Sequence, residues 1–116
     1  MALQKGVLMD EVNFHDSEIL AIQLDYMCKT AKLRVKLDDR NNSVKLLECT
    51  GVSVFIMSCL EPWGPGGYIF SVTKRVDKGK IKIDILFNSG DHIVIGCGNI
   101  RIVDFVNKSK TKIVGG

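Results

Sequence analysis

The chain has 116 residues, of which 46% are hydrophobic and 25% are charged, with a formal net charge of +3. These values exclude an intrinsically disordered chain and suit one folded domain that spans residues 1–116. No stretch approaches the roughly 20 apolar residues needed to cross a bilayer, so no membrane contact is expected. The charge is uneven, because the residues up to Tyr26 include one basic and five acidic side chains, whereas the rest include fifteen basic and eight acidic ones.

Residues 1–12 show weak periodicity and could form a short helix or a loose arm. A polar cluster at 13–18 then leads into a strand in which apolar side chains recur at every second position, which predicts that they face the core. These are Leu20, Ile22, Leu24 and Tyr26. Residues 31–37 alternate more strictly, with Ala31, Leu33, Val35 and Leu37 predicted to point inward. The Asp- and Asn-rich residues 38–43 predict the turn that follows.

The next strand is predicted from residue 44, with a bend at Gly51 before residues 52–57 continue it. Because this second half is apolar on both faces, we expect it to be central in a sheet or covered. A helical turn over residues 55–60 is the competing interpretation. Residues 61–67 contain two prolines and three glycines, which predicts a loop around Trp63.

Alternation resumes with Tyr68, Phe70 and Val72, which are predicted to face inward. Turns at 77–79 and 88–91 separate two further alternating segments, and a strand over 100–106 precedes a basic tail at 107–116. The pattern therefore predicts a mainly β fold: an antiparallel β-sandwich or partly open β-barrel of six to eight strands, with a short N-terminal helix as an option.

The four cysteines are widely spaced and include no Cys-x-x-Cys motif. The first residues lack the apolar run of a signal peptide. We therefore expect a reduced, cytoplasmic protein with free thiols, in which the cysteines with apolar neighbours are buried. These are Cys49, Cys59 and Cys97.

His15, Asp16 and Ser17 are the residue types of a hydrolytic triad, but they are consecutive. In an extended chain Asp16 would point away from the other two, so no proton relay can form among them. The remaining histidine is His92, and an enzyme would need a pocket that joins it to His15. No metal-ligand spacing is present. We therefore predict no catalytic residues, metal or cofactor; Asp16 and Ser17 should cap local backbone groups, and His15 should bond a carbonyl.

Two groups of basic residues alternate along predicted strands, one at 32–36 and one at 74–82. Such strands could follow a phosphate backbone while Tyr68 or Phe70 stacks on a base. Phe70, however, belongs to the predicted inward face and the net charge is modest, so nucleic acid is not the expected partner. Trp63 is expected either to form an exposed contact or to cover one end of the core.

Residues 14–19 (Phe-His-Asp-Ser-Glu-Ile) precede an alternating strand, and Gly51-Val52 enters a hydrophobic one. In these features the chain resembles small β-rich bacterial immunity proteins of contact-dependent growth inhibition and polymorphic toxin systems. The resemblance implies a protein without catalytic activity that neutralises one cognate toxin domain, often a nuclease, in a stoichiometric complex.

The resemblance supplies no contact residues, so the candidates for partner binding come from the acidic N-terminal segment and the proline-rich loop. They are Asp10, Glu11, His15, Asp16, Glu18, Glu61 and Trp63. The alternative function is a small β-barrel module that binds a small ligand or nucleic acid. The sequence makes no prediction of oligomeric state.

Overall fold

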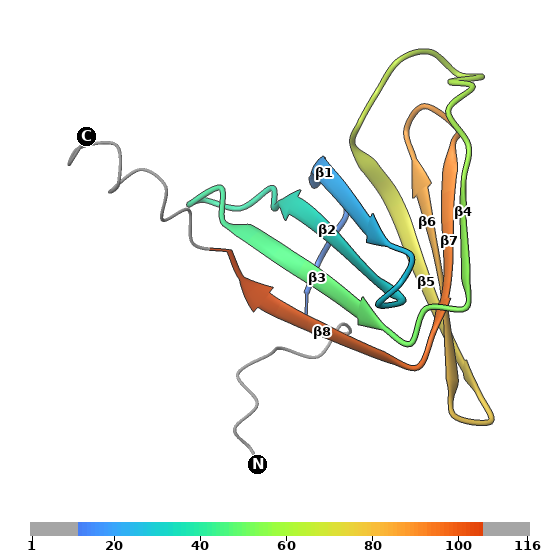
Figure 1. The fold of residues 1–116 in the computed structure, drawn as a ribbon. Helices are drawn as coiled ribbons and strands as arrows, with labels where there is room; N and C mark the ends of the chain where they lie inside the picture. Colours follow the sequence, from blue (N-terminus) through green and yellow to red (C-terminus); the bar gives the residue numbers. More distant parts are fainter. Residues whose placement is uncertain (1–11, 106–116) are drawn as a thin grey trace, which may run out of the picture.

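The computed structural model describes residues 12–105, so the predicted arm and the basic tail lie almost entirely outside the described residues. Eight antiparallel strands form two four-stranded sheets, and no helix occurs between residues 12 and 105. Figure 1 shows the sheets as two layers that diverge from a shared corner. The predicted mainly β fold is confirmed, and its form is sandwich-like.

The first sheet has the strand order β1-β2-β3-β8. Its strands are β1 (Glu18–Asp25), β2 (Thr30–Lys36), β3 (Val44–Thr50) and β8 (Asn99–Asp104). On β2 the predicted inward side chains Ala31, Leu33 and Val35 are buried, and Leu37 packs against the same core. Asp39 Oδ1 accepts a hydrogen bond from Ser43 N at 3.0 Å, which fixes the turn predicted between β2 and β3.

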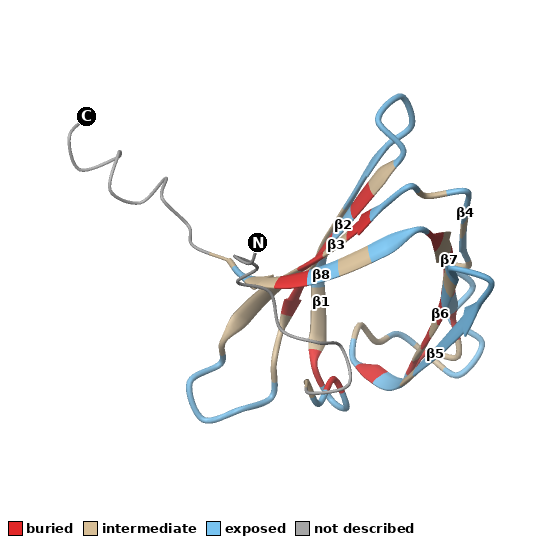
Figure 2. Cartoon of the chain, turned by 90° about the horizontal axis from the view of Figure 1, so that it is seen from below, coloured by how far each residue is buried: buried red, intermediate tan, exposed pale blue. Residues whose placement is uncertain are grey.

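The second sheet has the order β4-β7-β6-β5. Its strands are β4 (Val54–Met57), β5 (Ile69–Asp77), β6 (Lys80–Phe87) and β7 (His92–Cys97). Strict alternation on β6 and β7 buries Ile83, Ile85, Phe87, Ile93 and Ile95, as predicted. Figure 2 shows buried positions in both sheets, whereas much of β5 is exposed.

One corner of the sandwich is closed by pairing between the segment that enters β1 and the segment that enters β5. Glu18 and Tyr68 form an isolated antiparallel bridge. Backbone hydrogen bonds from Asp16 N to Ile69 O (2.8 Å) and from Ile19 N to Gly67 O (2.9 Å) extend it. The polar cluster at the start of β1 is therefore part of the joint between the two sheets.

The inward faces predicted for β1 and β5 are wrong for several residues, and beside this corner the cause is a register shift in each strand. In β1 the shift lies between Ile19 and Ala21. Ile19 and Ile22 pack on the core, whereas residues predicted to be buried are exposed. These are Leu20, which lies at the shift itself, Leu24, which lies near the far end of β1, and Tyr26, which follows the strand. In β5 the shift lies between residues 69 and 71, so that Ile69 is buried while Tyr68 and Phe70 are exposed.

The prediction that residues 52–57 are central or covered is also wrong. Gly51 bends the chain as predicted, with a φ of +65° that suits glycine. However, β4 is an edge strand paired with β7 alone, and Val54, Ile56 and Met57 are exposed. The competing helical turn over 55–60 is absent, because residues 54–57 are extended.

All four cysteines are free thiols, as predicted. Cys49 and Cys97 are buried between the sheets, but Cys59 is exposed, so its predicted burial is wrong. Burial and the neighbouring Cys97 thiol both raise the pKa of the Cys49 thiol, with the Cys97 contact as the larger cause. Cys49 therefore remains a neutral, unreactive thiol at physiological pH.

Candidate functional site

The loop between β4 and β5 carries Trp63, and a single buried carboxylate anchors the start of this loop. Asp91 Oδ1 accepts hydrogen bonds from Ser58 Oγ at 2.9 Å and from Leu60 N at 2.8 Å. Asp91 Oδ2 accepts hydrogen bonds from Glu61 N at 2.9 Å and from Ser89 Oγ at 3.0 Å. The β6–β7 turn thus fixes the backbone of the loop through several hydrogen bonds to one side chain.

Burial disfavours the charged form of Asp91, but these hydrogen bonds favour it more strongly. They therefore hold the pKa of the Asp91 carboxyl below its usual range, with Ser58 contributing most among the hydrogen-bond donors. The carboxylate is ionised at physiological pH and keeps all four contacts. The loop that follows β4 is consequently an ordered element and not a loose connection.

Trp63 itself is held by its backbone and by packing, while most of its ring faces solvent. Trp63 N donates to Ser89 O at 2.9 Å, and the indole lies over Gly90, where a Cβ would be only 2.9 Å from Trp63 Cδ2. The side chain is nevertheless 67% exposed, and the nearby Leu60 is 84% exposed. Of the two positions considered for Trp63, the structure shows the exposed one.

The N-terminal cluster has a structural role that can be followed atom by atom. Phe14 is buried in the core, and His15 Nδ1 lies 2.8 Å from Phe70 O, as predicted for a histidine that bonds a carbonyl. The local cap is supplied by Asn13, whose Oδ1 accepts a hydrogen bond from His15 N at 3.0 Å. The prediction that Asp16 and Ser17 provide such caps is wrong: among the described residues the buried Ser17 hydroxyl has no partner.

The structure describes five of the seven residues predicted to bind a partner. Asp10 and Glu11 lie outside the described residues. Glu18 forms an ion pair with Lys36 at 3.5 Å, and Asp16 lies 3.6 Å from His15 Nε2. Glu61 and Trp63 lie together in the anchored loop.

The two histidines have different partners. His15 lies against the Phe70 ring, with centroids 5.9 Å apart, and lines a hollow with Ser71 and Lys74. His92 Nδ1 lies 2.8 Å from Asp84 Oδ1 on the outer face of the second sheet.

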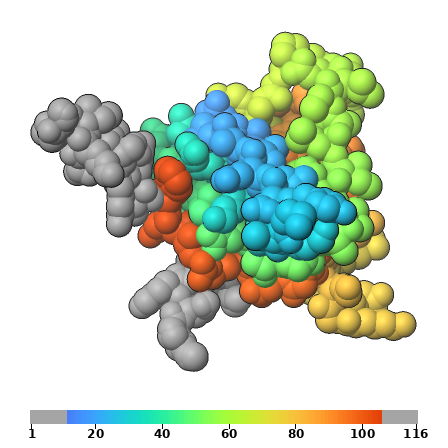
Figure 3. Space-filling model, viewed as in Figure 1, coloured from blue at the N-terminus to red at the C-terminus, as the bar shows by residue number. Residues whose placement is uncertain are grey.

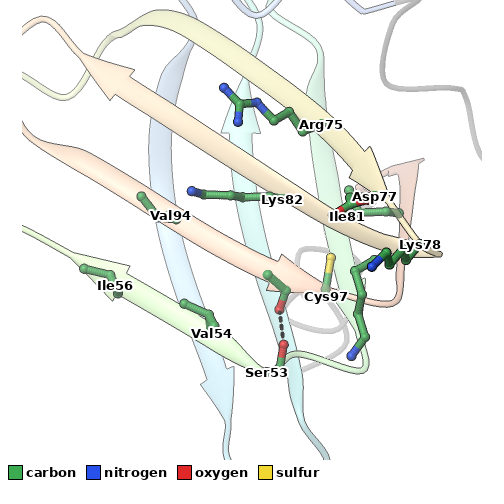
Figure 4. A pocket seen from close by; sticks show the side chains of 12 residues that line it. Ser53, Val54, Ile56, Arg75, Asp77, Lys78, Ile81, Lys82, Val94 and Cys97 are labelled. Atoms are coloured by element: carbon green, nitrogen blue, oxygen red, sulfur yellow. Dashed lines mark hydrogen bonds between the residues drawn. The ribbon is translucent and has the colours of Figure 1, made fainter.

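A second surface feature is a hollow of about 540 Å³ on the outer face of the second sheet. Figure 4 shows Val54, Ile56 and Val94 on one side of it, and Arg75 and Lys82 extending over the other side. Gly96 leaves room in the floor, since a Cβ there would approach Val54 Cβ to 3.3 Å. The hollow therefore combines aliphatic and basic groups.

Two further findings concern metal ions and membranes. Within residues 12–105 no group of three or more histidine, cysteine or acidic side chains is arranged to hold a metal ion. In the same part of the chain no helix is long and apolar enough to cross a membrane.

Sequence reasoning misses Asp91 and Leu60. The sequence places Asp91 only in a hairpin turn, because its loop partners lie about thirty residues earlier in the chain. Leu60 reads as part of an apolar run. In the sequence, an acidic residue in one turn and a proline-rich loop elsewhere give only a weak signal of an anchored loop. The signal becomes informative only when the fold places the two segments side by side.

Comparison with known proteins identifies a fold but no family. No protein-family model matches the chain, and no curated protein matches it. Among solved structures, an uncharacterized protein from Neisseria gonorrhoeae is similar, with a TM-score of 0.59 and 17% sequence identity. The match covers 78% of this chain and 92% of the other. At this identity the similarity shows a shared all-β fold.

Proposed function

We propose that the chain is an immunity-type protein that binds a cognate toxin domain and neutralises it in a stoichiometric complex in the cytoplasm. The resemblance of residues 14–19 and 51–52 supports the class of protein. The observation that carries the proposal of a binding role is the exposed Trp63 in a loop whose backbone is fixed by Asp91.

A fixed, exposed tryptophan has the properties of an interface anchor. Its ring offers a large apolar area that is removed from water only when a partner covers it. Because the loop is already ordered, binding avoids part of the ordering cost, which is about 0.5–1.5 kcal/mol for each immobilised flexible side chain. Tryptophan is accordingly among the residues that dominate protein interfaces.

The structure of this loop indicates which of the candidate residues should contribute most to partner binding. Leu60, Glu61 and Trp63 form the centre of the proposed surface, with two exposed apolar groups beside one carboxylate. His15 and Glu18 already have partners within the chain, so their substitution would alter the corner between the sheets as well as any interface. Asp10, Glu11 and Asp16 remain predicted contacts.

The proposal is tested by affinity capture of the tagged chain from a lysate of its source cells, followed by identification and recombinant expression of the captured domain. We expect an equimolar complex, and we expect co-expression of the chain to restore growth that the captured domain prevents. Trp63→Ala should weaken binding at least about 30-fold, the effect of losing an anchor worth about 2 kcal/mol.

Val76→Ala is the matched control, because Val76 is as exposed as Trp63 but lies on β5. A captured domain that does not affect growth would contradict the immunity function. Equal affinity of Trp63→Ala and the control would contradict the proposed surface.

A second candidate function is a module that binds nucleic acid or a small anionic ligand in the hollow beside Arg75 and Lys82. The exposed position of Phe70 removes one argument against it. True phosphate contacts would make affinity for a mixed-sequence oligonucleotide fall steeply with salt. A flat salt dependence would contradict nucleic-acid binding.

A further inference from the structure

The open edge of β4 is an unused strand-pairing site. Ser58 N donates to His92 O at 3.1 Å on the β7 side. Because strand amides alternate in direction, Val54 and Ile56 direct theirs to β7, whereas Phe55 and Met57 direct theirs to the open side. No strand among the described residues pairs with this side. It therefore presents backbone donors and acceptors to solvent.

The other edges of the two sheets carry features that discourage pairing, and β4 does not. The edges of β1 and β5 are partly covered by each other's entry segments, and both strands contain bulges and charged residues. β8 includes Arg101 and Asp104. β4 reads Val-Phe-Ile-Met and is the one described strand without a charged or titratable side chain. Natural proteins rarely leave such an edge uncovered.

The space beside this edge is already shaped by apolar side chains. A groove of about 660 Å³ lies between β4 and the end of β1, with Leu24 and Tyr26 on one wall and Val54 and Phe55 on the other. Asp25 and Lys29 line its β1 side as well. In Figure 3 the β1–β2 turn and the green segment that contains β4 lie side by side on the same face. A strand added to β4 would place its inner side chains against Leu24 and Tyr26, of which Tyr26 is 76% exposed.

We propose that the occupant of this edge is β4 of a second copy of the chain, paired antiparallel about a two-fold axis. The lining of the groove is mainly apolar, which favours an uncharged strand, and β4 itself is uncharged. Two-fold pairing of an uncharged strand with itself is self-complementary. It joins the two β4-containing sheets into one continuous sheet of eight strands.

The basic residues of the second sheet do not oppose this pairing. Lys82 lies on β6, two strands from the open edge. With strands about 4.8 Å apart, the two copies of Lys82 would be separated by roughly 24 Å. This is about three times the screening length of about 8 Å at physiological ionic strength, so their repulsion is small.

Antiparallel pairing also leaves the two Trp63 loops free. Each loop follows the end of its own β4, so the two-fold axis places the loops at opposite ends of the paired strands. Self-association therefore does not depend on the proposed binding of a toxin and does not block it. Because β4 is short, we expect a modest interface and a reversible dimer.

The test measures mass by sedimentation equilibrium from micromolar to millimolar protein, for the wild type, Ile56→Lys, Ile56→Glu and an equimolar mixture of the two variants. Ile56 is 59% exposed and points away from the core, so either charge should leave the monomer folded. We expect a reversible dimer of the wild type, monomers of each variant alone, and dimers again in the mixture, where opposite charges meet across the axis. Val76→Lys is the control on β5 and should dimerise like the wild type.

Hydrogen exchange shows whether the contact is strand pairing. The amides of Phe55 and Met57 should become protected as the wild type dimerises and should exchange rapidly in Ile56→Lys. A wild type that stays monomeric at millimolar concentration would overturn the proposal, even if a foreign strand were found on β4. Dimers that survive both Ile56 substitutions, or a mixture that stays monomeric, would also overturn it.

Discussion

Replacing Gly90 by alanine should displace Trp63 from its place over the β6–β7 turn. A Cβ at this position would lie 2.8 Å from Pro62 Cγ and 2.9 Å from Trp63 Cδ2, closer than carbon atoms can approach without movement. Gly90 also has a φ of +91°, which side chains disfavour. The substitution therefore introduces two costs, a steric clash and a strained backbone conformation.

Gly79→Ala separates these two costs, because Gly79 has a φ of +79° and a Cβ there would meet no atom within 4 Å. The strain costs about 1–2 kcal/mol. Alanine also restricts the unfolded chain more than glycine does, which stabilises the folded state by about 0.4–1 kcal/mol and partly offsets this strain. We therefore expect Gly79→Ala to lose about 1 kcal/mol. Gly90→Ala should lose roughly 1–3 kcal/mol more, the usual cost of overpacking, unless the loop moves to relieve it.

Urea unfolding measures both losses, and fluorescence reports the loop directly because Trp63 is the single tryptophan of the chain. We expect a changed emission spectrum for folded Gly90→Ala and an unchanged one for Gly79→Ala. Binding of a partner through Trp63 should weaken in the first variant only. Equal stability losses together with identical emission spectra would refute the packing of Trp63 on Gly90.

Phe14→Ala should lower the free energy of unfolding by about 3–5 kcal/mol, since it empties a core position, and urea unfolding will show the loss. A loss below about 1 kcal/mol would mean that Phe14 does not plug the core. The pKa of Asp91 is lowered in the folded chain, so its contribution to stability is complete above its ordinary value of 3.8 and is lost as the pH falls through the lowered pKa. Acid unfolding of Asp91→Asn should therefore show a shallower slope than that of the wild type; an unchanged slope would contradict the anchoring contacts. A thiol reagent added to the folded chain should react quickly with two cysteines, Cys28 and Cys59, and reaction of all four at one rate would contradict the burial of the others.

The strands that sequence reasoning predicts correctly are those whose environment is repeated at every second residue. β2, β6 and β7 lie inside their sheets and alternate without interruption, so the polarity of each side chain reports its face. The turns are predictable for a similar reason, because Asp, Asn and Gly act on backbone groups within a few residues. In both cases the physical cause is local.

The errors at the starts of β1 and β5 have one long-range cause. The bridge between Glu18 and Tyr68 joins the two entry segments, and the register shift of each strand begins within two residues of it. Each shift puts the residues before it out of phase with those after it, so Ile19 and Ile69 face the core where alternation from Ile22 and Val72 predicts the outer face. No pattern within either strand indicates that the other will lie beside it.

The anchored loop shows the same limit at the candidate site. Proline and glycine predict a loop around Trp63, but its order depends on Asp91, about thirty residues later in the chain. Composition alone therefore leaves open whether Trp63 is a lid or an exposed contact. The hydrogen bonds to one buried carboxylate decide the position of the ring, since they fix the loop where the indole faces solvent.

The error at β4 has a different origin and bears on assembly. Residues apolar on both faces predict a covered strand, and in the isolated chain the strand is exposed. The physical reason for the prediction still applies, because an uncharged edge with exposed Val54 and Ile56 favours further pairing. A sequence reflects the environment in which a protein functions, including contacts with other chains. An apolar strand that a correct fold leaves uncovered is therefore evidence for a contact outside the chain, and pairing of β4 with its own copy meets that need without any change to the fold.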